Sequence, residues 1–361
     1  MRKLNIYFRK NDQRWEGRIS RGKREDGKRK FQYILGRTKE DVAEKMMKIY
    51  SEEHQGMHCP KTITELFHEW QHSNQHRVKE STAANYAMKA NKHILPAFGD
   101  KQAEMLSQNE VYAFIEEKQK EGLSNRYIID IIILLKSLFK YAAGIYHIIN
   151  PLDGIIMPKN SKSEIQMLDK KEQATLQRYI AENQNETTLG IAISMSTGIR
   201  IGELCALQWR DIDLEKRILT VKKTIQRIQC PTETARTKLI ITEPKSESSR
   251  RTIPIPECLM DFLKKLKGNS NEYVLSGSEK PTEPRAMQYR FSKILKNVKL
   301  PSVHFHSLRH LFATTCVKLG FDIKALSEIL GHSSVEITLN RYVHSDFEQK
   351  RDYMKLIQLN F

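Results

Sequence analysis

Six residues in the second half of the chain have the types needed for chemistry at a phosphate. They are two arginines, a lysine, two histidines and a tyrosine: Arg200, Lys245, His306, Arg309, His332 and Tyr342. Arginine can grip two non-bridging oxygens at once, and histidine donates hydrogen bonds or moves a proton near neutral pH. Tyrosine can attack phosphorus and hold a covalent intermediate. The set predicts phosphoryl transfer on a nucleic acid, with guanidinium groups rather than a metal ion neutralising the transition state.

Each of these residues lies in its own short motif. The motifs are, in chain order, TGIRIGE at 197–203, EPK at 243–245, SRRTIP at 249–254, HSLRH at 306–310, LGHSS at 330–334 and RYVH at 341–344. A single motif of this kind carries little information. All of them in this order, closing on a tyrosine near the C-terminus, resemble the tyrosine recombinases, the family of phage and conjugative-transposon integrases. The resemblance is strongest over residues 164–361 and weaker toward the N-terminus.

The resemblance implies a role for each residue. Tyr342 would be the nucleophile that forms a 3′-phosphotyrosyl link with the cut strand. Arg200 and Arg309 would clamp the non-bridging oxygens of the phosphate, and His332 would donate a hydrogen bond to one of them. His306 would accept or relay the proton of the tyrosine.

Lys245 is the expected general acid. It lies between two predicted strands and would protonate the departing 5′ oxygen, because an alkoxide is a poor leaving group. It matches the family position since the SRRTIP motif follows at the expected distance. Three nearby lysines remain alternatives: Lys222, Lys223 and Lys238. Glu203, three positions after Arg200, is expected to orient that arginine rather than to react.

The overall charge also favours a nucleic acid partner. The 361 residues include 60 Lys and Arg against 43 Asp and Glu, a net charge of +17, which is typical of proteins that bind a polyanion. There is no secretory signal, and the most apolar stretch, 127–149, is interrupted by charged side chains. We therefore expect a cytoplasmic, nucleoid-associated protein with no membrane contact.

Neither a metal nor a cofactor is expected. The five cysteines are dispersed and form no Cys-x-x-Cys pair. His306 and His310 are four residues apart, but Ser307 occupies the place of the glutamate in the H-E-x-x-H zinc pattern. We expect His310 to have a structural role behind its helix.

Residues 1–55 are predicted to form a small basic domain. Three short strands at 4–8, 14–20 and 30–35 precede a helix that Thr38 begins as N-cap. Residues 1–30 contain twelve Lys and Arg against four Asp and Glu, a net charge of +8. The domain resembles the arm-type DNA-binding domains of integrases. Its candidate DNA contacts are Arg14, Arg18, Lys28 and Lys30.

Residues 62–152 are predicted to be entirely helical. A capping box at Thr62–Glu65 and serines at 81, 107 and 124 begin the helices, and Pro96 and Pro151 follow two of their ends. The segment resembles the SAM-like core-binding domain, a helical bundle that clamps DNA. Its candidate phosphate contacts are Arg77, Lys79, Lys89, Lys92 and Arg126.

Residues 164–361 are predicted to be the catalytic domain. Helices are expected at 169–183, 187–196, 201–208, 257–266, 285–298, 307–319, 323–330 and 334–342, with antiparallel strands at 217–223, 237–242 and 250–255. The tail after residue 345 has the pattern of a short amphipathic helix, which in the family docks on a neighbouring subunit. The fold class is therefore multidomain α+β: a small sheet with a helix, an all-α bundle, and a mainly α domain with a small sheet.

The predicted function is that of a site-specific recombinase that integrates and excises a mobile element. Expected partners are double-stranded DNA at core and arm attachment sites, three further copies in a homotetramer, an excision factor and a host DNA-bending protein. A type IB topoisomerase shares the chemistry, but it needs neither the arm-like domain nor the tail. A Xer-type dimer-resolving recombinase and a helix-turn-helix regulator without catalysis are the remaining alternatives.

Overall fold

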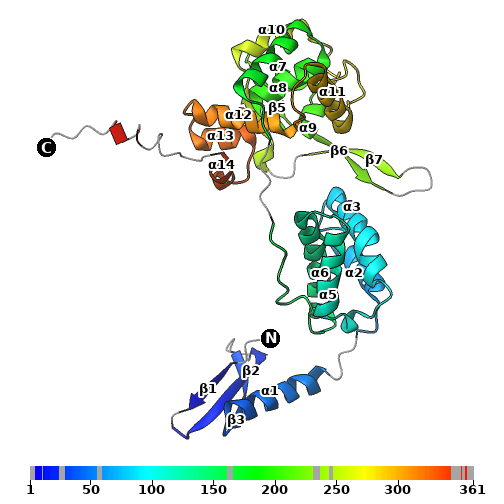
Figure 1. The fold of residues 1–361 in the computed structure, drawn as a ribbon, viewed down its shortest axis with the longest axis vertical. Coiled ribbons are helices and arrows are strands. Elements are labelled where there is room, and N and C mark those ends of the chain that lie inside the picture. The colour runs from blue at the N-terminus through cyan, green and yellow to red at the C-terminus, as the bar shows by residue number, and fades with distance from the viewer. Residues whose placement is uncertain are drawn as a thin grey trace, which may run out of the picture. The chain divides into compact units, whose positions relative to one another are not determined.

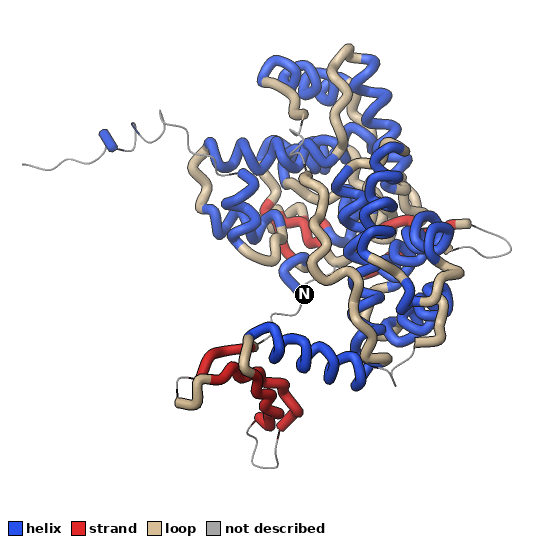
Figure 2. Tube along the Cα trace, turned by 60° about the horizontal axis from the view of Figure 1, so that its bottom comes forward, coloured by secondary structure: helices blue, strands red, loops and turns tan. Residues whose placement is uncertain are grey.

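Two compact units make up the chain, Met1–Lys162 and Ser163–Phe361 (Figure 1). The computed structural model describes residues 5–9, 11–23, 29–54, 59–160, 166–230, 236–243, 247–342, 351 and 354–355. Lys28, Lys245 and the predicted helix of the tail lie outside the described residues. Figure 2 shows strands in the N-terminal part and short strands among the helices of the second unit.

The first unit begins with a three-stranded antiparallel sheet and one helix. The strands β1 (Ile6–Arg9), β2 (Arg14–Lys23) and β3 (Arg29–Gly36) lie in the order β1-β2-β3, and α1 (Lys39–His54) follows them. Thr38 accepts a hydrogen bond from the backbone of Asp41 at 3.1 Å, as its predicted capping role requires. The small core between sheet and helix consists of Ile19, Ile34, Val42 and Met46.

A helical bundle forms the rest of the first unit. Its elements are α2 (Ile63–Asn74), α3 (Glu80–Lys89), the π-helical turn η1 (Ala90–Ile94), α4 (Leu95–Phe98), the 3₁₀ turn η2 (Ala103–Met105), α5 (Gln108–Lys120) and α6 (Asn125–Ile145). Capping boxes at Thr62 and Ser107 begin α2 and α5, and Ser124 caps α6. In the described parts of the chain, none of the helices has the length and apolarity that crossing a bilayer requires.

The end of the second bundle helix differs from the prediction. We expected Pro96 to stop a helix at residue 95, but the chain continues through η1 into α4, with Pro96 in the first turn of α4. Proline is tolerated in a first turn because its missing N–H has no partner there. The wider π turn absorbs the change of register between the two helices.

The second unit is mainly helical. Its helices are α7 (Lys170–Glu182), α8 (Glu186–Thr197), α9 (Ile201–Cys205), α10 (Glu257–Lys265), α11 (Pro284–Asn297), α12 (His306–Lys318), α13 (Ile323–Leu330) and α14 (Val335–Tyr342). All eight were predicted to within a few residues. Helix α8 is buried along most of its length. The neighbouring helices pack around it in one hydrophobic core.

Short antiparallel sheets accompany these helices. The strands β4 (Ile212–Asp213), β5 (Ile218–Val221) and β8 (Arg251–Pro254) form one sheet in the order β4-β5-β8, while β6 (Thr224–Gln229) and β7 (Thr237–Thr242) form a hairpin. The turns η3 (Trp209–Asp211) and η4 (Glu247–Ser249) are 3₁₀. The prediction missed β4 and β6. In β6 the buried residues Ile225 and Ile228 are three apart, which hides the period of two that identifies a strand.

Candidate active site

Arg200 is the N-cap of α9, and two acceptors hold its side chain. Its Nη1 donates to Oε1 of Glu203 at 2.8 Å, and its Nη2 donates to the carbonyl oxygen of Gly331 at 2.8 Å. The side chain remains 35% exposed. A guanidinium that two acceptors hold and that is still partly exposed to solvent is well placed to bind an incoming anion.

Glu203 is a buried carboxylate shared by two arginines. Besides Arg200, it accepts from Nη2 of Arg251 at 2.9 Å and from Nη1 of the same residue at 3.2 Å. Burial alone would raise the pKa of Glu203, but the charges of Arg251 and Arg200 hold this pKa below its ordinary value. Glu203 therefore stays ionised and orients Arg200, in line with the expectation from its spacing.

Arg251 is a residue whose importance the sequence analysis missed. It is 8% exposed, and its Nε also donates to the carbonyl oxygen of Ile329 at 2.6 Å. The side chain thus connects β8 to α9 and to the end of α13. The signal was the alternation in β8, where Arg251 and Ile253 face inward while Thr252 and Pro254 face outward.

Arg309 is the most deeply buried of the candidate residues, at 2% exposure. Its Nη1 donates to the carbonyl oxygen of Gly198 at 2.7 Å, and its Nη2 donates to that of Leu330 at 2.8 Å. Burial, together with the charges of Arg200 and Arg251, lowers the pKa of Arg309 to about 9. The group is still a cation at neutral pH, and a phosphate beside it would stabilise its charge.

The carbonyls that hold both arginines come from two helix ends. Gly198 closes α8 and Gly331 closes α13, each in the left-handed conformation with φ of 65°. This conformation favours glycine, and a cation is stabilised by the last carbonyls of a helix. The two glycines in the TGIRIGE and LGHSS motifs therefore serve to position Arg200 and Arg309.

His332 follows the Gly331 turn and lies parallel to the ring of Tyr342. The ring centroids are 6.3 Å apart with an interplanar angle of 6°. Its Nδ1 is 2.8 Å from the hydroxyl oxygen of Thr338. Burial and the charges of Arg309 and Arg200 lower the pKa of His332 to about 4, so the imidazole is neutral at neutral pH.

Tyr342 is the last residue of α14 and is 7% exposed. Its hydroxyl is buried and has no hydrogen-bond partner with acceptable geometry among the residues that the structure describes. Burial raises the pKa of Tyr342, against the opposing charges of Arg309 and Arg341. The phenol is therefore protonated at rest and must lose its proton to react.

One histidine of α12 contacts the Tyr342 ring, and a second contacts the first. The rings of His306 and His310 meet edge to face at 4.8 Å, and His310 also contacts the ring of Tyr342 at 5.5 Å. His306 is exposed, whereas His310 is 4% exposed and its Nδ1 has no partner among the described residues. Sequence reasoning placed His310 behind its helix, and the structure places it against the candidate nucleophile.

The position of Lys245 cannot be compared with these residues because it lies outside the described part of the chain. The flanking strands β7 and β8 do frame it, as predicted. Among the alternatives, Lys222 pairs with Asp211 at 3.0 Å, and Lys238 is in β7. The structure thus brings together five of the six candidates: Arg200, His306, Arg309, His332 and Tyr342.

The balance of charge at this cluster indicates its ligand. Four guanidinium groups, those of Arg200, Arg251, Arg309 and Arg341, lower the pKa of His332, while the carboxylate of Glu203 acts to raise the pKa of Arg309. A low-dielectric site with surplus positive charge favours an anion. A phosphodiester would supply that charge next to a tyrosine hydroxyl.

Comparison with known families agrees with this chemistry. The model of the phage integrase family matches residues 166–349, and that of the phage integrase N-terminal SAM-like domain matches residues 62–119. The chain belongs to the phage integrase family. It is a tyrosine recombinase, an enzyme that breaks and rejoins DNA, and the alternative of a regulator without catalysis is excluded.

Relatives are similar to the chain in sequence, and solved structures share its fold. The recombinase is 25% identical to a tyrosine recombinase XerC-like protein of Caldanaerobacter subterraneus, and the match covers 99% of both chains. It is 24% identical to the ICEBs1 integrase of Bacillus subtilis, over 70% of this chain and 71% of that one. The Tn1549 transposon integrase in complex with circular intermediate DNA has the same fold, with a TM-score of 0.69, 23% identity and coverage of 82% of this chain and 100% of that one. A lambda integrase tetramer bound to a Holliday junction gives a TM-score of 0.58 at 22% identity, covering 92% and 97%. The predicted α+β fold class is confirmed.

The exposed face of the N-terminal sheet is both basic and aromatic. Arg18 lies over the rings of Tyr7 and Tyr33, at 4.5 and 5.4 Å from their centroids, and donates to Glu16 at 3.0 Å. Arg14 and Lys30 are exposed on strands of the same sheet. Stacking on two rings holds the Arg18 guanidinium at the surface of the recombinase.

In the helical bundle, four of the five candidate cations are exposed: Arg77, Lys79, Lys92 and Arg126. Lys89 is the exception and corrects the prediction. It is 8% exposed, its Nζ is 3.3 Å from Oδ2 of Asp130, and it lies 5.7 Å from the centroid of the Tyr127 ring. Its alkyl stem packs in the bundle while its charge is paired, so it does not offer a free charge to DNA.

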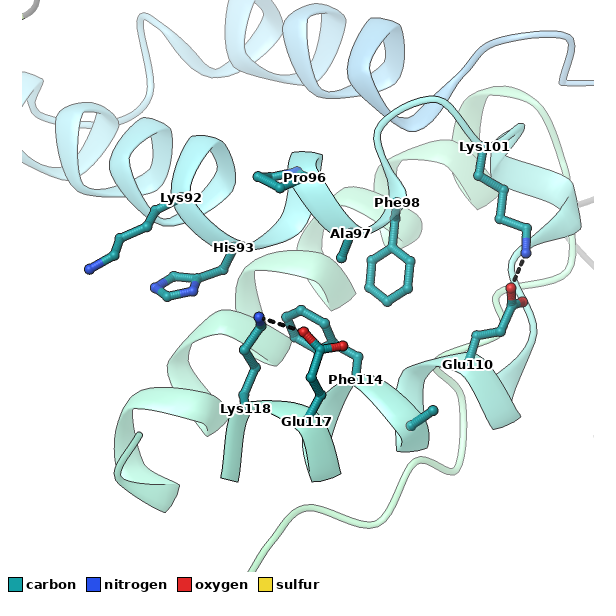
Figure 3. Close-up of a pocket in the computed structure, with 11 residues that line it drawn as sticks. Lys92, His93, Pro96, Ala97, Phe98, Lys101, Glu110, Phe114, Glu117 and Lys118 are labelled. Carbon is teal, nitrogen blue, oxygen red and sulfur yellow. Dashed lines mark hydrogen bonds and ion pairs between the residues drawn. The ribbon is translucent and has the colours of Figure 1, made fainter. Parts of the chain in front are cut away.

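A pocket of about 450 Å³ in the bundle is separate from the candidate active site (Figure 3). Its lining includes Lys92, His93, Phe98 and Phe114. Most of its charges are already paired: Lys101 bonds Glu110, and Lys118 bonds Glu117 and Glu121. Apart from Lys92, the lysines that line the pocket are therefore paired, unlike the arginine cluster near Tyr342.

Proposed function

We propose that the recombinase integrates and excises a mobile element, cutting one DNA strand at a time through Tyr342. The observation that carries this proposal is the buried Tyr342 hydroxyl next to Arg309, in a cluster where carbonyls hold Arg309 and a carbonyl and Glu203 hold Arg200. Such an arrangement is organised before substrate arrives, so little reorganisation is needed in the transition state.

The scissile phosphate would bind between Arg200, Arg309 and His332. The two guanidinium groups donate to the non-bridging oxygens, and the neutral imidazole adds one N–H. Charge on these oxygens grows as the phosphorus becomes five-coordinate, and the fixed cations stabilise it. The single negative charge of the phosphodiester would also raise the lowered pKa values of the nearby histidines.

Proton transfer would occur on both sides of the phosphorus. Tyr342 Oη forms a bond to phosphorus while its proton passes to His306, directly or through His310, which touches both rings. The bond from phosphorus to the 5′ oxygen breaks, and Lys245 donates the proton that completes the 5′ hydroxyl. The 3′-phosphotyrosyl link conserves the bond energy, so a 5′ hydroxyl from a partner duplex can reverse the step and join the new strand.

We assign the DNA contacts to three domains. Residues 1–55 would bind arm sites through the face that carries Arg14 and Arg18, with Lys30 exposed elsewhere on the same sheet, as strands of a small sheet can enter the major groove. Residues 62–152 would clamp the core site through the exposed cations of the bundle. Residues 164–361 would carry out catalysis, with the tail exchanged between subunits.

Relatives favour a mobile element over dimer resolution. Two of them are named the ICEBs1 integrase and the transposase from transposon Tn916, although another is named XerC-like. The arm-like domain adds to the case for a mobile element, either a conjugative element or a virus whose genome is integrated. We further propose core and arm attachment sites, a homotetramer on DNA, an excision factor, a host DNA-bending protein and a cytoplasmic, nucleoid-associated location.

A nicked duplex tests this function directly. DNA that flanks the gene supplies the attachment sequence, and a nick just 3′ of the cleavage position lets the small fragment diffuse away after attack. The account predicts a protein–DNA adduct on the 3′ phosphate and strand joining when a second duplex with a 5′ hydroxyl is added. Relaxation of supercoiled DNA without strand exchange between two attachment-site duplexes would indicate a topoisomerase, and no adduct would overturn the proposal.

A further inference from the structure

Thr338 is fully buried on α14, one helical turn before Tyr342. Its hydroxyl oxygen is 2.8 Å from Nδ1 of His332. Residues four apart share a face of a helix, so the helix that carries the nucleophile also contacts the imidazole that faces the phosphate. Neither the motifs nor the proposed function gives Thr338 a role.

The location of a single proton decides what His332 can do. Arginines on four elements surround the ring: Arg200 on α9, Arg251 on β8, Arg309 on α12 and Arg341 on α14. Their charges, together with burial, keep the imidazole neutral. A neutral imidazole donates from one nitrogen and accepts at the other, so only one of its two tautomers can donate to an anion from Nε2.

The direction of the hydrogen bond between Thr338 and His332 corresponds to one tautomer or the other. If Thr338 donates to Nδ1, the ring proton lies on Nε2. If Nδ1 donates instead, Nε2 presents a lone pair to the phosphate, and the negatively charged phosphate oxygens are repelled by that lone pair. Among the described residues, Nδ1 of His332 is the only hydrogen-bond partner recorded for the Thr338 hydroxyl.

We propose that Thr338 is a positioning residue whose hydroxyl donates to Nδ1 of His332 and thereby keeps a proton on Nε2, aimed at a non-bridging oxygen of the scissile phosphate. This inference rests on the proposed function of the site. The same contact links the position of His332 to that of Tyr342. Thr338 and Tyr342 are both on α14, so Thr338 can hold His332 only when Tyr342 is also in place.

The test is single-turnover cleavage of the nicked duplex by Thr338→Val and Thr338→Ser. Valine keeps the shape but removes the hydroxyl, and we expect a loss of roughly tenfold, the size of one neutral hydrogen bond. Serine keeps the hydroxyl and should recover most of the rate. The valine deficit should shrink as pH falls toward the pKa of His332, because an imidazolium carries protons on both nitrogens.

A double variant separates a positioning role from helix packing. In a His332→Ala background, Thr338→Val should cause no further loss if Thr338 acts through the imidazole. An equal loss in both backgrounds, or a valine variant as fast as wild type, would overturn the proposal. Wild-type adduct formation in the same assay tests the proposed function separately.

A measurement on the unmodified protein covers the case in which the valine variant does not fold. Long-range ¹H–¹⁵N correlation spectra of ¹⁵N-histidine protein distinguish the two tautomers, with His332→Gln identifying the signal. We expect His332 protonated on Nε2 at neutral pH. Protonation on Nδ1 would overturn the proposal whatever the activity of the enzyme.

Discussion

At the scale of single residues, the site depends on arginines that are buried before any anion arrives. Arg309 has lost nearly all of its solvent, and its two bonded acceptors are neutral carbonyls. Burial of a charge without a full counter-charge is unfavourable. The proposed phosphate would offset this unfavourable free energy when it binds beside Arg309, and most strongly in the transition state.

Arg309→Ala should therefore reduce cleavage by about 10²-fold or more, the effect of removing one transition-state donor. Arg309→Lys should recover only part of the rate, since an ammonium cannot hold the Gly198 and Leu330 carbonyls and two phosphate oxygens together. The measurement is single-turnover cleavage with binding measured in parallel. Arg178→Ala, at an exposed cation of α7 with no assigned DNA contact, is the control, and equal losses in both variants would contradict the assignment.

Stability should fall in acid because of His310. Its folded pKa, lowered to about 4 by burial and the nearby His306 and Arg341 charges, lies below the ordinary 6.5. The unfolded chain thus binds more protons between these values, so stability present above about pH 6.5 is lost as pH falls toward 4. His310→Gln should weaken this dependence in unfolding curves, while His304→Gln, at an exposed position, should leave it unchanged. An unaltered slope in His310→Gln would show that the shift is absent.

At the scale of elements, two left-handed glycines set the geometry of the clamp. A Cβ at Gly198 would lie 2.5 Å from Cδ1 of Phe312 and 2.8 Å from Cδ2 of Leu330. Gly320 also has a positive φ, 78°, but a Cβ there meets nothing within 4 Å. Alanine substitutions at Gly320 and Gly198 therefore distinguish the effect of backbone conformation alone from the added effect of steric crowding.

Gly320→Ala should lower the free energy of unfolding by about 1 kcal/mol, the cost of the left-handed conformation for alanine. Gly198→Ala should lower it by more, because the methyl group also displaces Phe312 and Leu330. Cleavage should fall in Gly198→Ala alone, since its carbonyl holds Arg309. Denaturant unfolding and cleavage rates check both points, and equal stability losses would show that crowding at Gly198 is relieved without strain.

The elements also show what the sequence could and could not predict. Caps such as Thr62 and Ser107, and glycines such as Gly331, identify helix ends because their chemistry is local. The buried Lys89 is paired with Asp130, which is distant in the chain. Arg251 likewise bonds two distant residues, Glu203 and Ile329. No local pattern encodes those partners. The resemblance to a family identified the candidate residues of the site, and the contact of His310 with Tyr342 needed the fold.

At the scale of the whole molecule, the arm domain should be separable from catalysis. The N-terminal sheet has its own small core, distinct from that of the bundle. Deletion of residues 1–55 should remove binding to a second set of DNA sites but leave adduct formation at the crossover site. It should also make total binding less dependent on salt, because fewer counterions are released. Footprinting and salt titration test this, and a truncated protein without any adduct would place an essential function in the deleted domain.

The central claim is that Tyr342 is the residue joined to DNA. Protease digestion of the trapped adduct, followed by mass spectrometry, identifies the peptide that carries the nucleotide. The account predicts a nucleotide on Tyr342, and no adduct from Tyr342→Phe, which keeps the ring and loses only the nucleophilic oxygen while still binding DNA. A nucleotide on Tyr353 or on any other residue, or full cleavage by Tyr342→Phe, would contradict it.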